Sequence, residues 1–563
     1  MLFNSYAFVF AFLPLFVAGF YTVSYMTKSH CLTNKADGAT NQKPACAINA
    51  VELYCVILSF IFFAFFGVKV FGVFVLSLVW NYAFIRILSA KNGSLIKTIS
   101  SGTNESGAHK KETGSFARAI LTAGICGNIA LLLFFKYAGF FAELINLISG
   151  SGITVAVLLP VAISFYTFSQ ISLLVDVYRN EVIDIHLIDY LSYITFFPKI
   201  LQGPIVRYTD MKKEFEKSLD LKWDTEAFMQ ALMLFVLGLS KKVIIADTLA
   251  IAVDYGYSNL QTLTPMDAIL TAVCYSFQIY FDFSGYCDMG RGVCQMVGMD
   301  LPINFESPYK ARNIDDFWKR WHMSLTTFFT RYVYIPLGGN RKGIVRTYIN
   351  FLIVFILSGF WHGAGLTFIV WGAMHGLLYV ITRAVKNFAV ASSKNVNKVE
   401  SVKNAYRGNK NVKAGTVEKN SSATLLPYKL ALILTFIFVS LAWVFFRANT
   451  VDDALTLISA MTRFKDYGAA ALMISKDFIK CFQIDELWYI FKITPIARMT
   501  WGPDVCMWFI IVICAALAFI SPNAAQLTQK HKVNVPGAML LAVLFVWSVI
   551  KFANVSTYIY LGF

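Results

Sequence analysis

The stretch FESPYKARNIDDFWKRWHMSLTTFFTRYVYIPLGGNRKG (residues 305–343) brings charged and aromatic residues together inside an otherwise hydrophobic chain. It contains His322, and a second histidine, His362, follows in the apolar sequence SGFWHGAG. An ionisable side chain within membrane-spanning sequence is costly, and it usually lines a cavity, meets a substrate or carries a proton. The two histidines are therefore the first candidates for the chemistry of this protein.

The composition around this stretch is that of a membrane protein. Hydrophobic residues make up 57% of the 563 positions and charged residues only 15%. Many windows exceed the roughly 18 apolar residues that indicate a spanning helix, residues 153–176 and 265–285 among them, so we expect an all-α polytopic fold with about 11 spans. The first window, residues 2–25, lacks a basic leader region and a small-residue cleavage site, which favours a retained helix over a signal peptide.

The charge distribution predicts the orientation of the loops. A net charge of +16 would suggest a nucleic-acid partner for a soluble protein, but here it indicates positive loops on the cytoplasmic side, and no nucleic-acid partner is expected. Residues 386–419 hold eight Lys or Arg against two Glu, which predicts a flexible cytoplasmic insertion. Residues 447–498 carry seven basic and six acidic side chains, so we expect this segment and the C-terminus outside.

The ten cysteines show no CxxC spacing, so most of them are expected to be small buried hydrophobic residues. Cys31 and Cys46 share one polar loop and could form a disulfide if that loop were external. Its three lysines against one aspartate favour the cytoplasm instead.

Residues 314–329 carry the clearest helical periodicity in the charged stretch. Apolar residues recur at spacings of three and four, which predicts one amphipathic helix along the membrane interface, in contact with lipid. His322 lies four residues after Trp318 and so belongs to the buried face. It either lines the mouth of a cavity or is a core histidine satisfied by a backbone carbonyl. The apolar face consists of Ile314, Phe317, Trp318, Trp321, Leu325 and Phe328.

The sequence YIPLGGNRKG after this helix predicts a tight turn that carries Arg341 and Lys342. Such a turn could meet an anionic headgroup or a nucleotide phosphate, although it has no phosphate-loop spacing. A positive loop on the cytoplasmic side is the alternative.

His362 and His375 lie thirteen residues apart in the next apolar segment. On one continuous helix this spacing is a rotation of about 220°, so both could not face one site. Surrounding glycines allow close helix approach and a kink near His362. We therefore expect a functional role for His362 and helix packing for His375.

Several familiar enzyme signatures are missing from the sequence. It contains no GxSxG, HExxH, HxxxxD or dinucleotide-binding glycine pattern. The sequence therefore gives no support for a function as a hydrolase or a metalloenzyme, and no metal site is predicted.

Six motifs together resemble the membrane-bound O-acyltransferases, in the bacterial subgroup that serves alginate and peptidoglycan O-acetylation. The intact IPLGGNR favours this branch over teichoic-acid D-alanylation. One departure stands at Thr330 and Arg331, where many relatives have Arg followed by Asp. The motifs are LLPVAISFYTFSQISLLVDVYR (158–179), FFPKILQGPIVRY (196–208), YFDFSGYCDMGRG (280–292), FWKRWHMSLTTFFTRYVYIPLGGNRKG (317–343), GFWHGAGLTFIVWGAMHG (359–376) and AWVFFRA (442–448).

The resemblance implies a ring of spanning helices, with re-entrant and interfacial helices, around a central tunnel. It implies that His362 is the catalytic base and that His322 is the second histidine of the subgroup, which would position the thioester. The donor would be acetyl-CoA or another acyl-CoA from the cytoplasm, used as a substrate with no bound cofactor. Its phosphates would be drawn by a basic region made of Lys310, Arg312, Lys319, Arg320, Arg341 and Lys342.

The C-terminal sequence STYIYLGF resembles a terminal motif of the same subgroup, whose tyrosine has been proposed to carry the acyl group outward. This resemblance places Tyr560 at the acceptor position. A phenol ester is activated enough to pass the group on, and covalent handover divides one transfer into two steps. An aromatic residue anchored at the membrane interface is the alternative.

The resemblance also implies a bacterial inner-membrane location, a secreted SGNH-type acetyltransferase as partner, and a polysaccharide or cell-wall glycan as final acceptor. The expected organisation is N-terminal spans in residues 1–144, a catalytic core in 145–385, the basic insertion in 386–427 and C-terminal spans in 428–563. Two other functions stay open at this point. A transporter or flippase would also place histidines and Asp282 in membrane sequence, and a non-catalytic scaffold for a periplasmic acyltransferase would keep the motifs of the fold.

Overall fold

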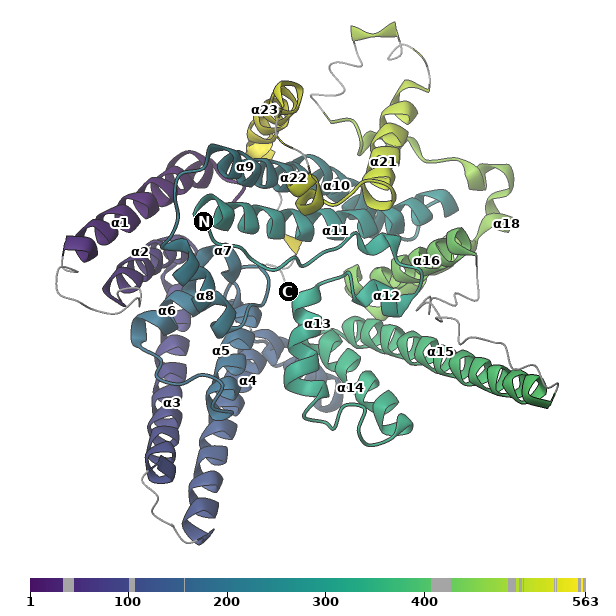
Figure 1. Ribbon diagram of the computed structural model, residues 1–563. Helices are drawn as coiled ribbons and strands as arrows, with labels where there is room; N and C mark the ends of the chain where they lie inside the picture. The colour runs from purple at the N-terminus through teal and green to yellow at the C-terminus, as the bar shows by residue number, and fades with distance from the viewer. Residues whose placement is uncertain are drawn as a thin grey trace.

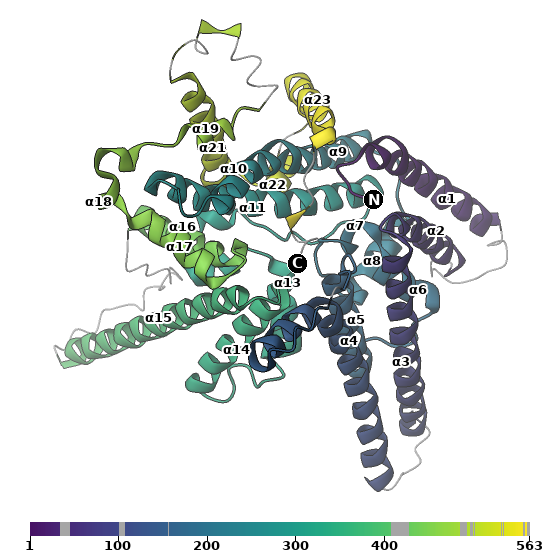
Figure 2. The same ribbon diagram turned by 180° about the vertical axis from the view of Figure 1, so that it is seen from behind.

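The computed structural model describes residues 1–33, 45–100, 107–155, 157–406, 427–484, 493–495, 499, 501–530, 532, 534–554 and 558–559. Every regular element within these residues is a helix, which confirms the predicted all-α class. Nine of the described helices are long and apolar enough to cross a membrane, against the about 11 spans predicted. The protein is a multi-pass membrane protein, and Figures 1 and 2 show its long helices arranged around a centre.

The first half of the chain forms one side of this arrangement. A π-helical turn, Phe8–Phe12, leads directly into the first long helix, which begins the protein with an apolar span. The window 153–176 is not one span, because irregular backbone precedes a helix of 16 residues. The helices are α1 (Leu13–Thr33), α2 (Ala45–Ala64), α3 (Val68–Ser100), α4 (Gly107–Ser149), α5 (Ile163–Tyr178), α6 (Leu187–Thr195), α7 (Phe197–Ile200) and α8 (Tyr208–Ser218).

Helix α11 (Pro265–Met296) lies next to the centre and is buried along most of its length. Helix α9 (Thr225–Ser240) packs along it and continues through a π-helical segment, Lys241–Ala246, into α10 (Asp247–Ser258). The two backbones approach closely, since a Cβ atom on Gly238 would lie 2.6 Å from the Gly285 carbonyl oxygen. The window 265–285 is therefore part of an interior helix and is not among the nine apolar spans.

The predicted single interfacial helix over residues 314–329 is wrong. The segment forms two short helices, α12 (Ile314–Trp318) and α13 (Met323–Phe329). The helical conformation is interrupted at His322, whose φ is +43°. Asn304 stabilises the break, because its side-chain oxygen accepts hydrogen bonds from the backbone and the hydroxyl of Ser324. The aromatic residues Phe317, Trp318 and Trp321 pack into the protein core.

Helices α14 (Ile344–His362) and α15 (Leu366–Tyr406) pack against each other as a hairpin. The expected kink near His362 is a complete break: α14 ends at His362 and the next residue, Gly363, is extended. A Cβ on Gly372 would lie 2.5 Å from the Phe355 carbonyl oxygen, so the predicted close approach of glycines is present.

Helix α15 continues beyond the expected boundary at 385/386, so residues 386–406 of the basic insertion are helical. Residues 407–426 of that insertion, and the side chains of Cys31 and Cys46, lie outside the described part. The remaining helices are α16 (Tyr428–Arg447), α17 (Val451–Thr462), α18 (Phe464–Tyr467), α19 (Lys476–Lys480), α21 (Gly502–Phe519), α22 (Ala524–Lys530) and α23 (Val535–Ile550).

The C-terminal tail returns from α23 to the interior of the protein (Figure 1, yellow, beside the mark C). Tyr558 belongs to a hydrophobic cluster built mainly by α1–α9. Ile559 packs against a second cluster, which α10–α12, α16 and α21 build. The tail thus joins two cores, while Tyr560 itself lies outside the described residues.

Candidate functional site

His362 is the last residue of α14 and lies at the centre of an aromatic group. Its side chain is buried, and three rings surround the imidazole: Trp361 at 4.7 Å, Trp371 at 5.1 Å and Phe446 at 5.1 Å between ring centroids. Helices α14, α15 and α16 each supply one of these rings. The break after His362 therefore presents an imidazole at the end of a helix, inside a cage formed by three helices.

His322 is also fully buried, at the break between α12 and α13, so its predicted buried position is confirmed. Its Nδ1 lies 3.2 Å from the side-chain oxygen of Asn304. This oxygen also accepts from the Ser324 backbone, so we assign Nδ1 as the donor, which leaves Nε2 as an acceptor. Nε2 has no hydrogen-bond partner among the described residues. Burial lowers the pKa of His322 to about 3, so the ring is neutral near pH 7.

Trp361 connects the two histidines. Its ring lies 6.3 Å from the His322 imidazole and 4.7 Å from that of His362, measured between centroids. Lys136 of α4 donates to the Trp361 backbone oxygen at 2.5 Å. The structure thus brings both predicted histidines to one place, together with a lysine that sequence reasoning missed. A single cation in the apolar run LLLFFKYAGF was the signal that could have identified it.

His375 lies in α15 and contacts the same aromatic group from the other side. The Trp318 indole donates to His375 Nδ1 at 3.3 Å, and the Trp371 ring lies 4.9 Å from the imidazole. These contacts tie α15 to α12, as expected for a packing residue. The break between α14 and α15 is the reason that His362 and His375 approach one cluster despite their spacing.

The six residues of the predicted basic region have different surroundings. Lys310 donates to the carbonyl oxygens of Ile520 and Ser521, at the end of α21, at 3.1 and 2.7 Å. Arg312 lies 5.7 Å from the centre of the Tyr428 ring.

Lys319 and Arg320, just after α12, pair with Asp315 and Asp316 of that helix at 3.1 and 2.9 Å. Arg341 and Lys342 are exposed in the turn before α14. Several of the predicted cations therefore already bind protein groups.

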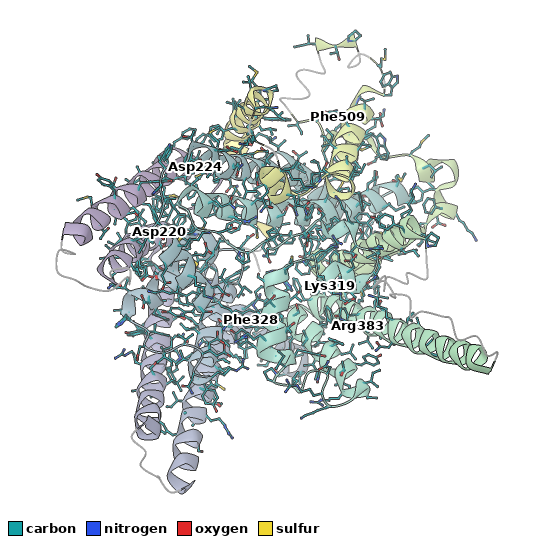
Figure 3. All side chains as sticks on the ribbon, viewed as in Figure 1. Asp220, Asp224, Lys319, Phe328, Arg383 and Phe509 are labelled. Carbon is teal, nitrogen blue, oxygen red and sulfur yellow. The ribbon has the colours of Figure 1, made fainter. Side chains whose placement is uncertain are left out.

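Asp315 holds α12 against α15. Its buried carboxylate pairs with Lys319, Arg383 and Lys386, the latter two at 3.0 and 2.8 Å. Burial alone would raise the pKa of Asp315, but these cations lower it to about 2. Lys319 and Arg383 are labelled in Figure 3, which shows them at the junction of the two elements.

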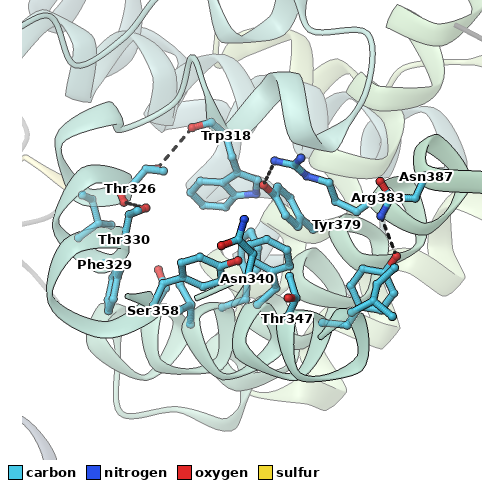
Figure 4. Close-up of a pocket in the computed structure, with 17 residues that line it drawn as sticks. Trp318, Thr326, Phe329, Thr330, Asn340, Thr347, Ser358, Tyr379, Arg383 and Asn387 are labelled. Atoms are coloured by element: carbon cyan, nitrogen blue, oxygen red, sulfur yellow. Dashed lines mark hydrogen bonds between the residues drawn. The ribbon is translucent and has the colours of Figure 1, made fainter. Parts of the chain in front are cut away.

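A cavity of about 450 Å³ lies between α13, α14 and α15 (Figure 4). Arg383 and Asn387 line one end, and Thr326 and Thr330 line the other. Ser358 also lines it, one helical turn before His362. Most of the remaining wall is aromatic or aliphatic, so the cavity suits an elongated ligand with a polar end.

Arg331, which departs from the family pattern, contacts two acidic residues. The buried Asp176 accepts from Arg207 at 3.2 Å and from the Tyr332 hydroxyl at 2.9 Å, and Arg331 lies 3.6 Å from it. Arg331 also contacts Glu181. Arginine therefore takes part in an ion-pair network at this position.

The buried carboxylate of Asp282 is paired with a buried lysine. Lys242 lies 2.7 Å from Asp282 and 2.8 Å from Asp247. The Tyr558 ring of the tail packs 4.7 Å from the same ammonium group. Phe283, the residue after Asp282, contacts the His322 ring at 4.8 Å, so the residue of α11 next to this ion pair touches one of the two histidines.

Comparisons with known proteins show which family this sequence resembles. A sequence model of the membrane-bound O-acyltransferase family matches residues 116–396. The chain is 34% identical to a peptidoglycan O-acetyltransferase from Helicobacter pylori over 82% of this chain and 80% of that protein. It is 33% identical to a probable alginate O-acetylase AlgI from Pseudomonas putida over 84% and 82%. Similarity to a teichoic acid D-alanyltransferase from Bacillus subtilis, at 32% identity, covers 38% of this chain and 57% of that protein.

Proposed function

This chain belongs to the membrane-bound O-acyltransferase family, and we propose that it takes an acetyl group from a cytoplasmic acyl-CoA for O-acetylation of an extracytoplasmic polysaccharide or cell-wall glycan. It is a multi-pass membrane enzyme that transfers acyl groups. The names of its relatives, which specify peptidoglycan or alginate acetylation, support acetyl as the acyl group and a glycan as the acceptor. We place it in the bacterial inner membrane.

The caged histidine at the end of α14 is the observation that carries this proposal. In the reaction, the His362 imidazole removes the proton of the attacking hydroxyl as the oxygen bonds to the thioester carbon. The carbon–sulfur bond then breaks, and the leaving thiolate takes the proton. A cage of three aromatic rings excludes water, which strengthens every electrostatic contact with the reacting groups.

His322 positions the donor in this mechanism. Its Nδ1–H is used by Asn304, so the acceptor lone pair of Nε2 is the part that can meet a ligand. A buried acceptor of this kind suits an N–H group, such as an amide of the pantetheine arm of CoA. Its low pKa keeps the ring neutral near pH 7, so the Nε2 lone pair stays available as an acceptor.

The tail gives the acetyl group a route outward. We propose that Tyr560 accepts the acetyl group from the donor and passes it on, which requires the tail to reach the histidines. Its neighbour Ile559 donates to Asp282 at 3.1 Å, and Phe283 contacts His322, which supports this requirement. A secreted SGNH-type acetyltransferase would then complete the transfer to the glycan.

The donor would enter from the cytoplasmic side. The cavity beside Ser358 supports this route, because Ser358 lies one helical turn before His362 in α14. Arg341 and Lys342 follow Asn340, which lines the cavity, and their exposed cations would attract the phosphates of CoA.

The test uses the purified protein in lipid vesicles with radiolabelled acetyl-CoA, scored by release of CoA and by transfer of label. His362→Ala should abolish both, and His362→Gln is expected to behave alike. His375→Asn is the matched control, since an asparagine oxygen can replace Nδ1 as the acceptor for Trp318. Full transfer by His362→Ala at equal protein levels would reject the base assignment. Absence of CoA release by the wild type, with acetyl-CoA moved across the membrane intact, would favour a transporter, and absence of both would favour a scaffold.

A further inference from the structure

Lys136 is a charged residue in membrane sequence that the mechanism above does not use. It lies in the candidate span Gly114–Ser149, and it is the one charged residue between Arg118 and Glu143. Among the described residues, no carboxylate lies within ion-pair distance of its ammonium group. A lone ammonium group at this depth is costly, and it persists where it binds protein groups that matter.

The ammonium group binds the backbone that carries His362. Its Nζ lies 2.5 Å from the carbonyl oxygen of Trp361. This carbonyl belongs to the peptide group that joins Trp361 to His362, so the contact fixes the plane of that peptide. The ammonium group also lies 5.9 Å from the centre of the Trp361 ring, on the side chain that contacts both imidazoles.

The end of α14 needs such a partner. The last four carbonyl groups of a helix receive no hydrogen bond from an N–H group of the same helix, and they form the negative end of the helix dipole. The carbonyl of Trp361 is one of these, and Gly363 follows in extended conformation. A cation at this place caps the helix at the residue before the reactive histidine.

A second contact joins the same two segments. The ring of Tyr137 stacks on Phe360 at 4.3 Å between centroids, with an interplanar angle of 17°. Lys136 and Tyr137 of α4 therefore hold Phe360 and Trp361 of α14 as a pair. The stacked rings stabilise the packing of α4 against α14. The hydrogen bond from Lys136 orients the Trp361 carbonyl group.

We propose that Lys136 is a positioning residue for His362, which caps α14 and fixes the orientation of the imidazole within the aromatic cage. This inference rests on the proposed function of His362. Lys136 acts through the peptide group and makes no contact with the reacting atoms.

The experiment compares three variants in the vesicle assay. Lys136→Met removes the charge at similar length, Lys136→Arg keeps a charged donor, and Tyr137→Phe removes a hydroxyl that has no partner among the described residues. Lys136→Met should lower kcat by about 10- to 100-fold with the KM for acetyl-CoA little changed, because a charge-assisted hydrogen bond is lost. Lys136→Arg should recover most of the rate, and Tyr137→Phe should match the wild type.

Thermal unfolding in detergent separates positioning from general stability. At equal amounts of folded protein, Lys136→Met should lose rate while Lys136→Arg and Tyr137→Phe keep most of it. If Lys136→Met does not fold, Lys136→Gln retains a neutral donor and takes its place. A rate unchanged by Lys136→Met, or a loss of rate that only matches the loss of folded protein, would overturn the proposal.

A measurement independent of activity completes the test. Hydrogen exchange of residues 356–365 should be faster in Lys136→Met than in Tyr137→Phe. If His362→Ala keeps its activity, the proposed function fails, and exchange alone then decides whether Lys136 fixes this turn. Unchanged exchange in Lys136→Met would reject the cap.

Discussion

The backbone N–H of Ile559 donates to Asp282 Oδ2 at 3.1 Å, which ties the C-terminal tail to the middle of α11. Asp282 receives this bond while it pairs with Lys242, so the tail is held by a charged group that is itself buried. Ile559 is therefore anchored at Asp282, and the next residue of α11, Phe283, contacts His322.

The seated tail gives a direct test of the tyrosine relay. Tyr560→Phe keeps the ring and removes the hydroxyl, so it should abolish outward transfer and prevent labelling of the protein by radiolabelled acetyl-CoA. Tyr558→Phe is the control, because the Tyr558 hydroxyl is buried without a hydrogen-bond partner among the described residues. Loss of that hydroxyl should be neutral or slightly stabilising. Full activity of Tyr560→Phe would reject the relay and leave His362 as base.

The buried ion pair predicts a large effect on stability. Lys242→Met leaves Asp282 and Asp247 buried without their cation, so we expect a loss of about 3–5 kcal/mol in the free energy of unfolding. Lys532→Met removes an exposed partner of Glu226, so it should leave the free energy of unfolding nearly unchanged. Thermal unfolding in detergent measures both. Equal melting temperatures for the two variants would contradict the assigned role of Lys242.

His322, which lies outside the nine apolar spans, predicts a pH dependence. Its pKa is about 3 in the folded protein, below the about 6.5 of an exposed histidine. The unfolded chain therefore binds more protons between these values, so stability is lost as the pH falls from about 6.5 towards 3.

The matched variant is His322→Asn, because asparagine tolerates the left-handed backbone and retains a donor for Asn304. The melting temperature of the wild type should fall more steeply between pH 7 and about 4.5 than that of His322→Asn. Parallel curves would show that His322 is not kept neutral by burial.

Labelling from each side of the membrane tests the predicted orientation. In a background without reactive native cysteines, a cysteine at Ser401 should react from the cytoplasm and one at Asn449 from outside, since the first segment is strongly basic and the second nearly neutral. The reverse pattern would overturn the orientation and the proposed entry side of the donor.

The sequence pattern was sufficient for the fold class, because long apolar windows determine an all-α membrane protein. It also singled out His322 and His362, which the structure brings to one ring, that of Trp361, while their catalytic roles stay predictions. His322 is buried as predicted, but the spacing to Trp318 does not explain it, because the helix is interrupted between the two residues.

Details that depend on distant residues could not be derived. The break at His322 is stabilised by Asn304, and Lys136 finds its partner 225 positions away in α14. The pairing of Lys319 and Arg320 was available in principle, because Asp315 and Asp316 precede them by four residues in the sequence. Reading these lysines and arginines as free phosphate ligands overlooked that local neutralisation.

Tyr558 and Ile559 join the two hydrophobic clusters, yet they are synthesised after every helix that surrounds them. A chain cut short before residue 558 would therefore carry all nine described spanning helices and still lack the contact that Tyr558 and Ile559 make between the two clusters.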